Sequence, residues 1–176
     1  MNRRHLLKLG ALSAVAVAGG GYWALGRGEV PGEVSLAGAR QVLAALVDQS
    51  LVSLEGWSPT EVFNHCAQSI EYSISGYPEL KPAWFRASVG PMAFGLFASR
   101  GAMRHGLAEA IPGAAPLSEP ASQALALQRL QRAFEAFAGY RGELRPHFAY
   151  GELSHADYAQ AHVLHLYNHL SLIRPA

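Results

Sequence analysis

The chain has 176 residues, of which 50% are hydrophobic and 15% are charged, and its formal net charge is +1. This length suits one globular domain with a hydrophobic core, and the near balance of charges argues against nucleic acid as a partner. The single cysteine, Cys66, excludes an intramolecular disulfide and a thiolate metal cluster. We expect this cysteine to pack in the core as a small apolar side chain.

The first 28 residues have the pattern of an export signal followed by a linker. Basic residues near the start precede an apolar run, and small residues suited to cleavage follow. The stretch from Arg3 to Lys8 reads RRHLLK and resembles the twin-arginine signal. We therefore predict an exported protein, periplasmic or in the cell envelope, with its domain over residues 29–176. The alternative is an uncleaved membrane anchor, because residues 9–26 just reach the length that spans a bilayer.

The first half of the domain carries the signals of two helices. Apolar residues recur at helical spacing over roughly residues 35–54, which predicts a first helix there. A second helix is predicted to begin after Ser58 and to stop at Gly76. Pro59 at its first position and Glu61 as the partner in a capping box both support this start.

The second half predicts a crossover and two further helices. Six prolines fall between residues 77 and 120, so we expect a long crossover there, with a broken helical piece around residues 83–106. Helical spacing returns over residues 118–139, and Ser154 is a cap for the last helix. No run predicts a convincing pair of strands. The pattern therefore indicates an all-α fold, a four-helix bundle with a long crossover between helices 2 and 3.

Histidines border the apolar stripe of the last helix. His162, His165 and His169 face inward at the edge of that stripe when the helix is drawn as a wheel. His165 and His169 are four residues apart, so their Cβ atoms lie about 5–6 Å from each other and the pair can close on one metal ion. A third imidazole is available from His65, in the middle of the second helix. Such a site suits zinc, nickel, ferrous iron or copper, and the sequence does not choose among them. The alternative is that these are core or surface histidines with no ligand role.

Two stretches of the chain also resemble a known family. They read WSPTEVFNHCAQSIEYSISGYPEL and PHFAYGELSHADYAQAHVLHLYNHL. They resemble the DinB-like superfamily of metal-binding four-helix bundles, and within it an uncharacterised branch known as a domain of unknown function. The resemblance covers about residues 35–174 and implies that His65, His165 and His169 are the metal ligands. Relatives in the superfamily often dimerise, which makes a homodimer one expectation for this chain.

Other polar residues are candidates for the surroundings of this site. His162 lies two helical turns before His169 on the last helix. It either lines the cavity or has a structural role. His147, in the loop before the last helix, is placed to line the mouth of a pocket. Glu61, Gln68 and Tyr72 share one helix face with the histidine of the second helix. They could hold its free ring nitrogen or contact a substrate, although Glu61 has an alternative role in the capping box.

A divalent ion with three protein nitrogens and a free position can activate water or polarise a substrate oxygen or sulfur. Together with the resemblance, this predicts a metal-dependent hydrolase or transferase acting on a small molecule. A thiol-dependent reaction fits an exported protein least, because low-molecular-weight thiols are expected mainly in the cytoplasm. One alternative is a non-catalytic metal or small-ligand binding protein of the cell envelope, which the lack of paired carboxylates on the histidine-bearing faces favours. Another is a bundle without metal that acts through its surface.

Overall fold

The computed structural model describes residues 31–118 and 121–176, and this part of the chain is mainly helical with one small sheet. In chain order, the elements are α2 Leu36–Ala45, β1 Leu51–Ser53, α3 Pro59–Ser75, α4 Ala83–Arg86, α5 Val89–Arg100, α6 Gln123–Gly139, α7 His155–Leu170 and β2 Ile173–Pro175. The export signal and the anchor predicted for residues 1–28 lie outside the described residues. Among the described helices, none combines the length and apolar character that crossing a membrane requires.

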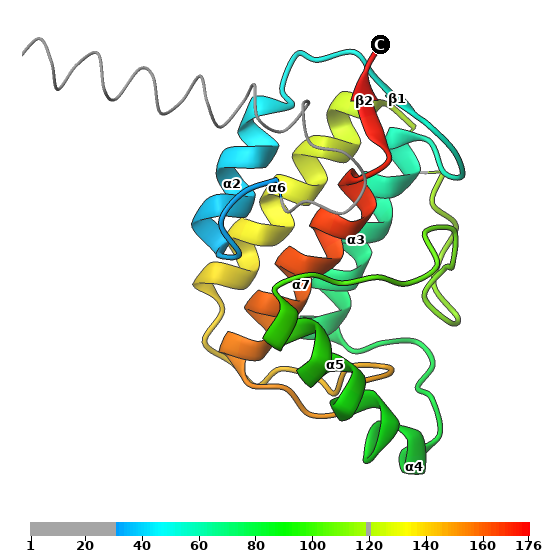
Figure 1. The fold of residues 1–176 in the computed structure, drawn as a ribbon, viewed down its shortest axis with the longest axis vertical. Coiled ribbons are helices and arrows are strands. Elements are labelled where there is room, and N and C mark those ends of the chain that lie inside the picture. Colours follow the sequence, from blue (N-terminus) through cyan, green and yellow to red (C-terminus); the bar gives the residue numbers. More distant parts are fainter. Residues whose placement is uncertain (1–30, 119–120) are drawn as a thin grey trace, which may run out of the picture.

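Helices α2, α3, α6 and α7 lie side by side and share one core (Figure 1). Helices α2 and α3 each pack against both α6 and α7. Leu43, Phe63, Phe134 and Leu166, one from each of these helices, are all fully buried in the same apolar cluster. Each buried side chain of this size contributes about 1.5–3 kcal/mol to folding through the hydrophobic effect. This packing brings the inward faces of α3 and α7, where the predicted ligands lie, into contact.

Local capping fixes where α3 begins and ends, as the sequence predicts. The Ser58 hydroxyl oxygen accepts a hydrogen bond from the backbone N–H of Glu61, and the Glu61 carboxylate accepts one from the backbone N–H of Ser58 at 2.8 Å. Pro59 occupies the first turn, where no backbone donor is needed. Gly76 ends the helix with a φ of +108°, a conformation that only glycine adopts without strain.

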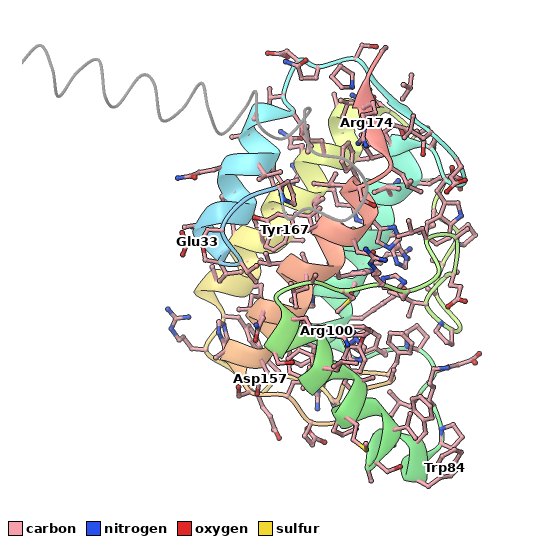
Figure 2. All side chains as sticks on the ribbon, viewed as in Figure 1. Glu33, Trp84, Arg100, Asp157, Tyr167 and Arg174 are labelled. Atoms are coloured by element: carbon pink, nitrogen blue, oxygen red, sulfur yellow. The ribbon has the colours of Figure 1, made fainter. Side chains whose placement is uncertain are left out.

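The start of α7 is fixed in the same way. The Ser154 hydroxyl and the Asp157 carboxylate form a second capping box, which confirms the predicted start of the last helix. Further along α7, the Tyr167 hydroxyl donates a 2.9 Å hydrogen bond to the backbone carbonyl of Glu33 (Figure 2). This bond ties the last turn of α7 to the segment just before α2.

The first predicted helix is wrong at its C-terminal end. Helix α2 stops at Ala45, and Asp48 then adopts a φ of 61°, which no helix accommodates. Residues 51–53 form β1, which pairs antiparallel with β2 so that Leu51 faces Pro175. The expectation that the chain contains no strand pair is therefore also wrong. Three-residue strands are too short to show an alternating pattern, and the two partners lie at opposite ends of the domain.

The crossover runs from α3 to α6 and includes the predicted broken helical piece, seen as α4 and α5. The chain then continues as a loop across α7 and α3 (Figure 1). Met103 and Ile111 are buried and anchor this loop. The side chains of Asn64 and Gln68 on α3 donate hydrogen bonds to loop carbonyl groups. The crossover therefore covers the side of the molecule on which α3 and α7 meet.

Candidate metal centre

Three histidines from two helices converge at the contact between α3 and α7. We refer to His65, His165 and His169 as the three-histidine cluster. The Nε2 atom of His165 lies 3.1 Å from that of His65 and 3.0 Å from that of His169. A set of potential ligand atoms, one from each of these residues, lies within 4.8 Å of one another. The structure therefore brings together the residues that the sequence predicts, in an arrangement that could hold a metal ion.

No placement of protons on the three rings turns both close Nε2 contacts into hydrogen bonds. In a neutral imidazole, each ring nitrogen either donates one hydrogen bond or accepts one. The Nε2 atom of His165 has two Nε2 neighbours within hydrogen-bond distance and can serve only one of them. A shared cation would instead accept the lone pair of all three Nε2 atoms. The Nδ1 atoms of His65 and His169 would then carry the protons; both atoms are buried and have no hydrogen-bond partner.

Burial keeps the imidazoles of the cluster neutral. His65 and His169 are buried, with exposed fractions of 2% and 1%, while His165 is partly exposed. Burial, together with the neighbouring His105, lowers the pKa of His65 to about 3. Burial and neighbouring histidines hold the pKa values of His165 and His169 well below the ordinary value. Neutral imidazole is the form that binds metal ions, so all three lone pairs are available near pH 7.

A tryptophan forms an apolar wall beside the cluster. The ring of Trp57 is stacked on that of His169, with 6.0 Å between centroids and 10° between planes. It also contacts the ring of His65 at 4.8 Å between centroids. Trp57 immediately precedes the N-cap of α3, so the same capping box that starts the helix also positions this wall. An apolar wall limits the access of water and strengthens electrostatic interactions at the site.

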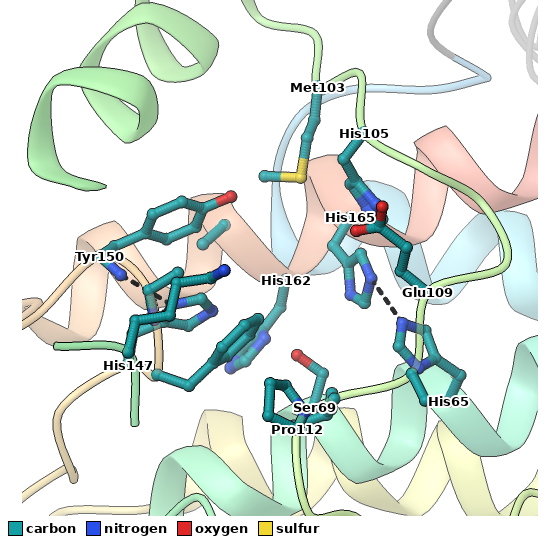
Figure 3. A pocket seen from close by; sticks show the side chains of 16 residues that line it. His65, Ser69, Met103, His105, Glu109, Pro112, His147, Tyr150, His162 and His165 are labelled. Carbon is teal, nitrogen blue, oxygen red and sulfur yellow. Dashed lines mark hydrogen bonds between the residues drawn. The ribbon is translucent and has the colours of Figure 1, made fainter. Parts of the chain in front are cut away.

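A pocket of about 220 Å³ opens on the cluster and is drawn in Figure 3. His65 and His165 line one end of it. The rest of the lining comes from α3, the crossover, the loop before α7 and α7 itself: Ser69, Lys81, Met103, His105, Glu109, Ala110, Ile111, Pro112, His147, Phe148, Ala149, Tyr150, Ala161 and His162. A pocket of this size suits a small molecule.

His147 lines this pocket, as the sequence predicts. Its Nδ1 atom accepts hydrogen bonds from the backbone N–H groups of Ala149 and Tyr150, both at 3.1 Å. Burial and the neighbouring His162 hold the pKa of His147 well below its ordinary value. The ring is therefore neutral and carries its proton on Nε2, so it is a hydrogen-bond donor.

His162 lines the pocket too, and it is buried with an exposed fraction of 3%. Its Nε2 atom lies 3.2 Å from the hydroxyl oxygen of Ser73. The Ser73 hydroxyl already donates to the carbonyl of Ile70 at 2.6 Å, so the imidazole must be the donor to Ser73. Burial, together with His155, lowers the pKa of His162 to about 3, which keeps the ring neutral. The structure thus gives His162 a structural hydrogen bond and a place in the pocket wall.

The other candidates on α3 are absent from the pocket lining. The carboxylate of Glu61 is engaged in the capping box. Gln68 is buried, and its amide nitrogen donates to the carbonyl of Ala115 at 2.9 Å, which holds the crossover loop. The ring of Tyr72 contacts that of Tyr77, with 5.9 Å between centroids. A shared helix face therefore does not bring these residues to the pocket.

Two titratable residues beside the cluster have no signal in the sequence. His105 and Glu109, on the loop between α5 and α6, line the pocket beside His65 and His165 (Figure 3). The ring centroid of His105 is 5.1 Å from those of both His165 and His169. Neither residue has a helical spacing to the histidines of the cluster, because the loop folds back over α3 and α7 from far away in sequence.

Comparison with known proteins places the described domain in a family. No curated protein and no solved structure matches the chain significantly. The model of a family described as "Protein of unknown function (DUF1569)" matches residues 34–176, which is nearly the whole described domain and includes every residue of the three-histidine cluster. The chain therefore belongs to the DUF1569 family.

Proposed function

We propose that this protein binds one divalent transition-metal ion through His65, His165 and His169. The observation that carries the proposal is the convergence of three Nε2 atoms at 3.0 and 3.1 Å, which no choice of tautomers satisfies. Zinc, nickel and ferrous iron, and also copper, accept three neutral imidazoles, so the donor set fits several metals.

We further propose that the site is that of a metal-dependent hydrolase or transferase. When bound, the ion would act as a Lewis acid that lowers the pKa of water or polarises a substrate oxygen. The pocket beside the cluster admits a small molecule and ends at His65 and His165. Its position supports a reaction at the ion rather than at a remote surface.

Residues of the pocket wall supply the remaining chemistry. The carboxylate of Glu109 lines the pocket near the cluster and is placed to accept or donate a proton. The Nε2–H group of His147 can donate a hydrogen bond that orients a substrate carbonyl or carboxylate. Lys81 lines the same pocket and favours a substrate with an anionic group.

The second candidate is a non-catalytic metal or small-ligand binding protein of the cell envelope. Within the described residues, Glu109 is the one carboxylate that lines the pocket, and it is exposed. A single exposed carboxylate is a sparse acid–base set for a hydrolase, which favours this second candidate. Both candidate functions include the metal site. They differ in whether a molecule bound in the pocket is converted to a product.

The proposal also covers the fold family of the protein and its export. We propose that the helices α2, α3, α6 and α7 form a DinB-like four-helix bundle, which the packing of α2 and α3 against both α6 and α7 supports. We propose export by the twin-arginine route, supported by the RRHLLK stretch near the N-terminus. A periplasmic or envelope location follows from that route.

Metal analysis of the chain purified without a histidine tag tests the proposal. Wild type should hold close to one ion per chain. His165→Ala should lose this ion, because only two of the three imidazoles remain to bind it. His155→Ala is the matched control, since His155 is also on α7 but is exposed and lies outside the pocket lining. Substoichiometric metal that His165→Ala leaves unchanged would overturn the metal site. Activity against a panel of esters, amides and group acceptors then divides the enzyme from the binding protein.

A further inference from the structure

A fourth imidazole lies beside the three-histidine cluster. The ring centroid of His105 is 5.1 Å from that of His165 and 5.1 Å from that of His169. Within the cluster itself, the corresponding centroid separations are 4.7, 4.8 and 4.9 Å. His105 therefore stands almost as close to two of the ligands as these stand to one another.

The hydrogen bonding of His105 leaves one nitrogen ready to act as a ligand. Its Nδ1 atom lies 2.8 Å from the backbone carbonyl oxygen of Gly106. A carbonyl oxygen only accepts, so Nδ1 carries the proton and Nε2 has a free lone pair. This Nε2 atom is buried and has no hydrogen-bond partner. An orphaned buried acceptor is unfavourable, which indicates that it meets a partner in another state of the site.

The position of His105 in the fold differs from that of the other three histidines. The cluster is held on α3 and α7, whereas His105 is on the loop between α5 and α6. Its ligand atoms fall outside the set that lies within 4.8 Å, so the loop must shift for His105 to reach a shared ion. His105 also lines the pocket, together with His65 and His165.

We propose that His105 is a displaceable fourth ligand of the metal centre, which binds the ion when the pocket is empty and yields its place to an entering small molecule. This inference rests on the proposed metal site. A site with four protein ligands is closed, whereas a site with three has a position for substrate. A loop-borne fourth histidine lets one site alternate between these two forms, because the ligands on helices stay in place.

Cobalt binding to the untagged 176-residue chain tests this proposal. The dissociation constant for Co²⁺ is measured by competition with a chelator, and azide is then titrated into the cobalt-loaded protein while its visible absorption is followed. His105→Ala should weaken cobalt binding by roughly 10- to 100-fold, the range found when groups around a metal site are removed. The same variant should bind azide about tenfold more tightly than wild type, because azide no longer competes with an imidazole.

These opposite changes separate a ligand from a structural residue. His155→Ala is the matched control and should leave both constants unchanged, and His105→Gln is a second variant that keeps a polar side chain. If His105→Ala and His105→Gln match wild type in both constants, or if they weaken cobalt and azide binding together, the proposal is overturned. If wild type itself binds no cobalt, the metal site fails and this inference fails with it. The dissociation constant of wild type for Co²⁺ thus tests the metal site. The ratio of the variant's constants to those of wild type tests the role of His105.

Discussion

At the scale of single residues, the candidate site depends on imidazoles that burial keeps neutral and on one indole that covers them. Trp57 contacts two of the three cluster histidines, whereas Trp84 is 66% exposed on the short helix α4 (Figure 2). These two of the three tryptophans in the chain therefore report on different parts of the molecule. Paramagnetic ions quench the fluorescence of an indole only at short range.

Trp57 should therefore report metal binding. We expect Ni²⁺ or Cu²⁺ to quench part of the tryptophan fluorescence of the wild-type protein. Most of this quenching should be lost in Trp57→Phe, because Trp57 is stacked beside the ring of His169. Trp84→Phe is the control and should keep it. Equal quenching in Trp57→Phe and in wild type would place the bound ion away from the cluster.

Glu109 carries the acid–base part of the enzyme proposal. On any substrate that the activity panel identifies, Glu109→Gln should lower kcat by about 10²–10⁴-fold, the range that general acid–base catalysis contributes. Metal content should stay at the wild-type level, because Glu109 is outside the set of close ligand atoms. Glu143→Gln, at an exposed carboxylate outside the pocket lining, should leave kcat unchanged. Full activity in Glu109→Gln would exclude this residue as the acid or base.

At the scale of elements, the small sheet holds together the ends of the two helices that carry the three-histidine cluster. Strand β1 precedes α3 and strand β2 follows α7, so their pairing joins the start of one helix to the end of the other. Backbone hydrogen bonds from Leu54 to Leu172 and from Ala176 to Ser50 extend the pairing at both ends. Ile173 of β2 is fully buried in the core.

Loss of the Ile173 side chain should loosen this connection. Ile173→Ala should lower the free energy of unfolding by about 2–5 kcal/mol, the range for truncating a buried isoleucine. Metal affinity should fall as well, because His169 lies one turn before the strand. Val52→Ala in β1, at a 44% exposed position, is the control and should change stability by less than about 0.5 kcal/mol. Chemical denaturation of both variants measures the difference, and equal values would show that the sheet does not support the helices.

At the scale of the whole molecule, the buried histidines make the stability of the metal-free protein depend on pH. Burial lowers the pKa values of His65 and His162 from 6.5 to about 3 in the folded protein. Between these values the unfolded chain binds more protons than the folded one, so acid favours unfolding. The contribution of the buried histidines is complete above about pH 6.5 and is lost as the pH falls toward 3.

The metal-free protein should therefore lose stability steeply below pH 6.5. Each fully buried histidine should cost about 1.4 kcal/mol per pH unit in this window. Thermal unfolding in the presence of a chelator at pH 7.5, 6.5 and 5.5 should show little change between the first two values and a clear fall at the third. His162→Phe should reduce the slope, because it removes one of the buried rings. A melting temperature that is independent of pH would contradict neutral burial of these rings.

Local signals predicted the parts of the site that lie on helices. The capping boxes at Ser58 and Ser154 fixed the starts of α3 and α7, and the spacing of four residues identified His165 and His169 as a pair. The same logic did not show that Glu61, Gln68 and Tyr72 lie outside the pocket lining, although it did recognise the capping-box role of Glu61. A helical wheel gives only the direction of a side chain about the axis, and it does not show which turn faces the pocket.

Contacts that depend on distant segments could not be read from the sequence. His105 reaches the cluster because the crossover loop folds across α3 and α7, and no residue spacing encodes that path. Trp57 could be recognised as the residue before a helix cap, but not as the wall of a site. Strands of three residues gave no alternating pattern, so the sheet was missed as well.

The position of a bound metal ion is the most direct test of the three-histidine cluster as a metal site. Crystals of the untagged protein soaked with Zn²⁺ or Ni²⁺ and measured at the absorption edge of the metal locate it by anomalous scattering. We predict one strong peak at about 2.0–2.1 Å from the Nε2 atoms of His65, His165 and His169. A metal-soaked crystal with no anomalous peak between α3 and α7, or with its peak on other residues, would contradict a metal site at the three-histidine cluster.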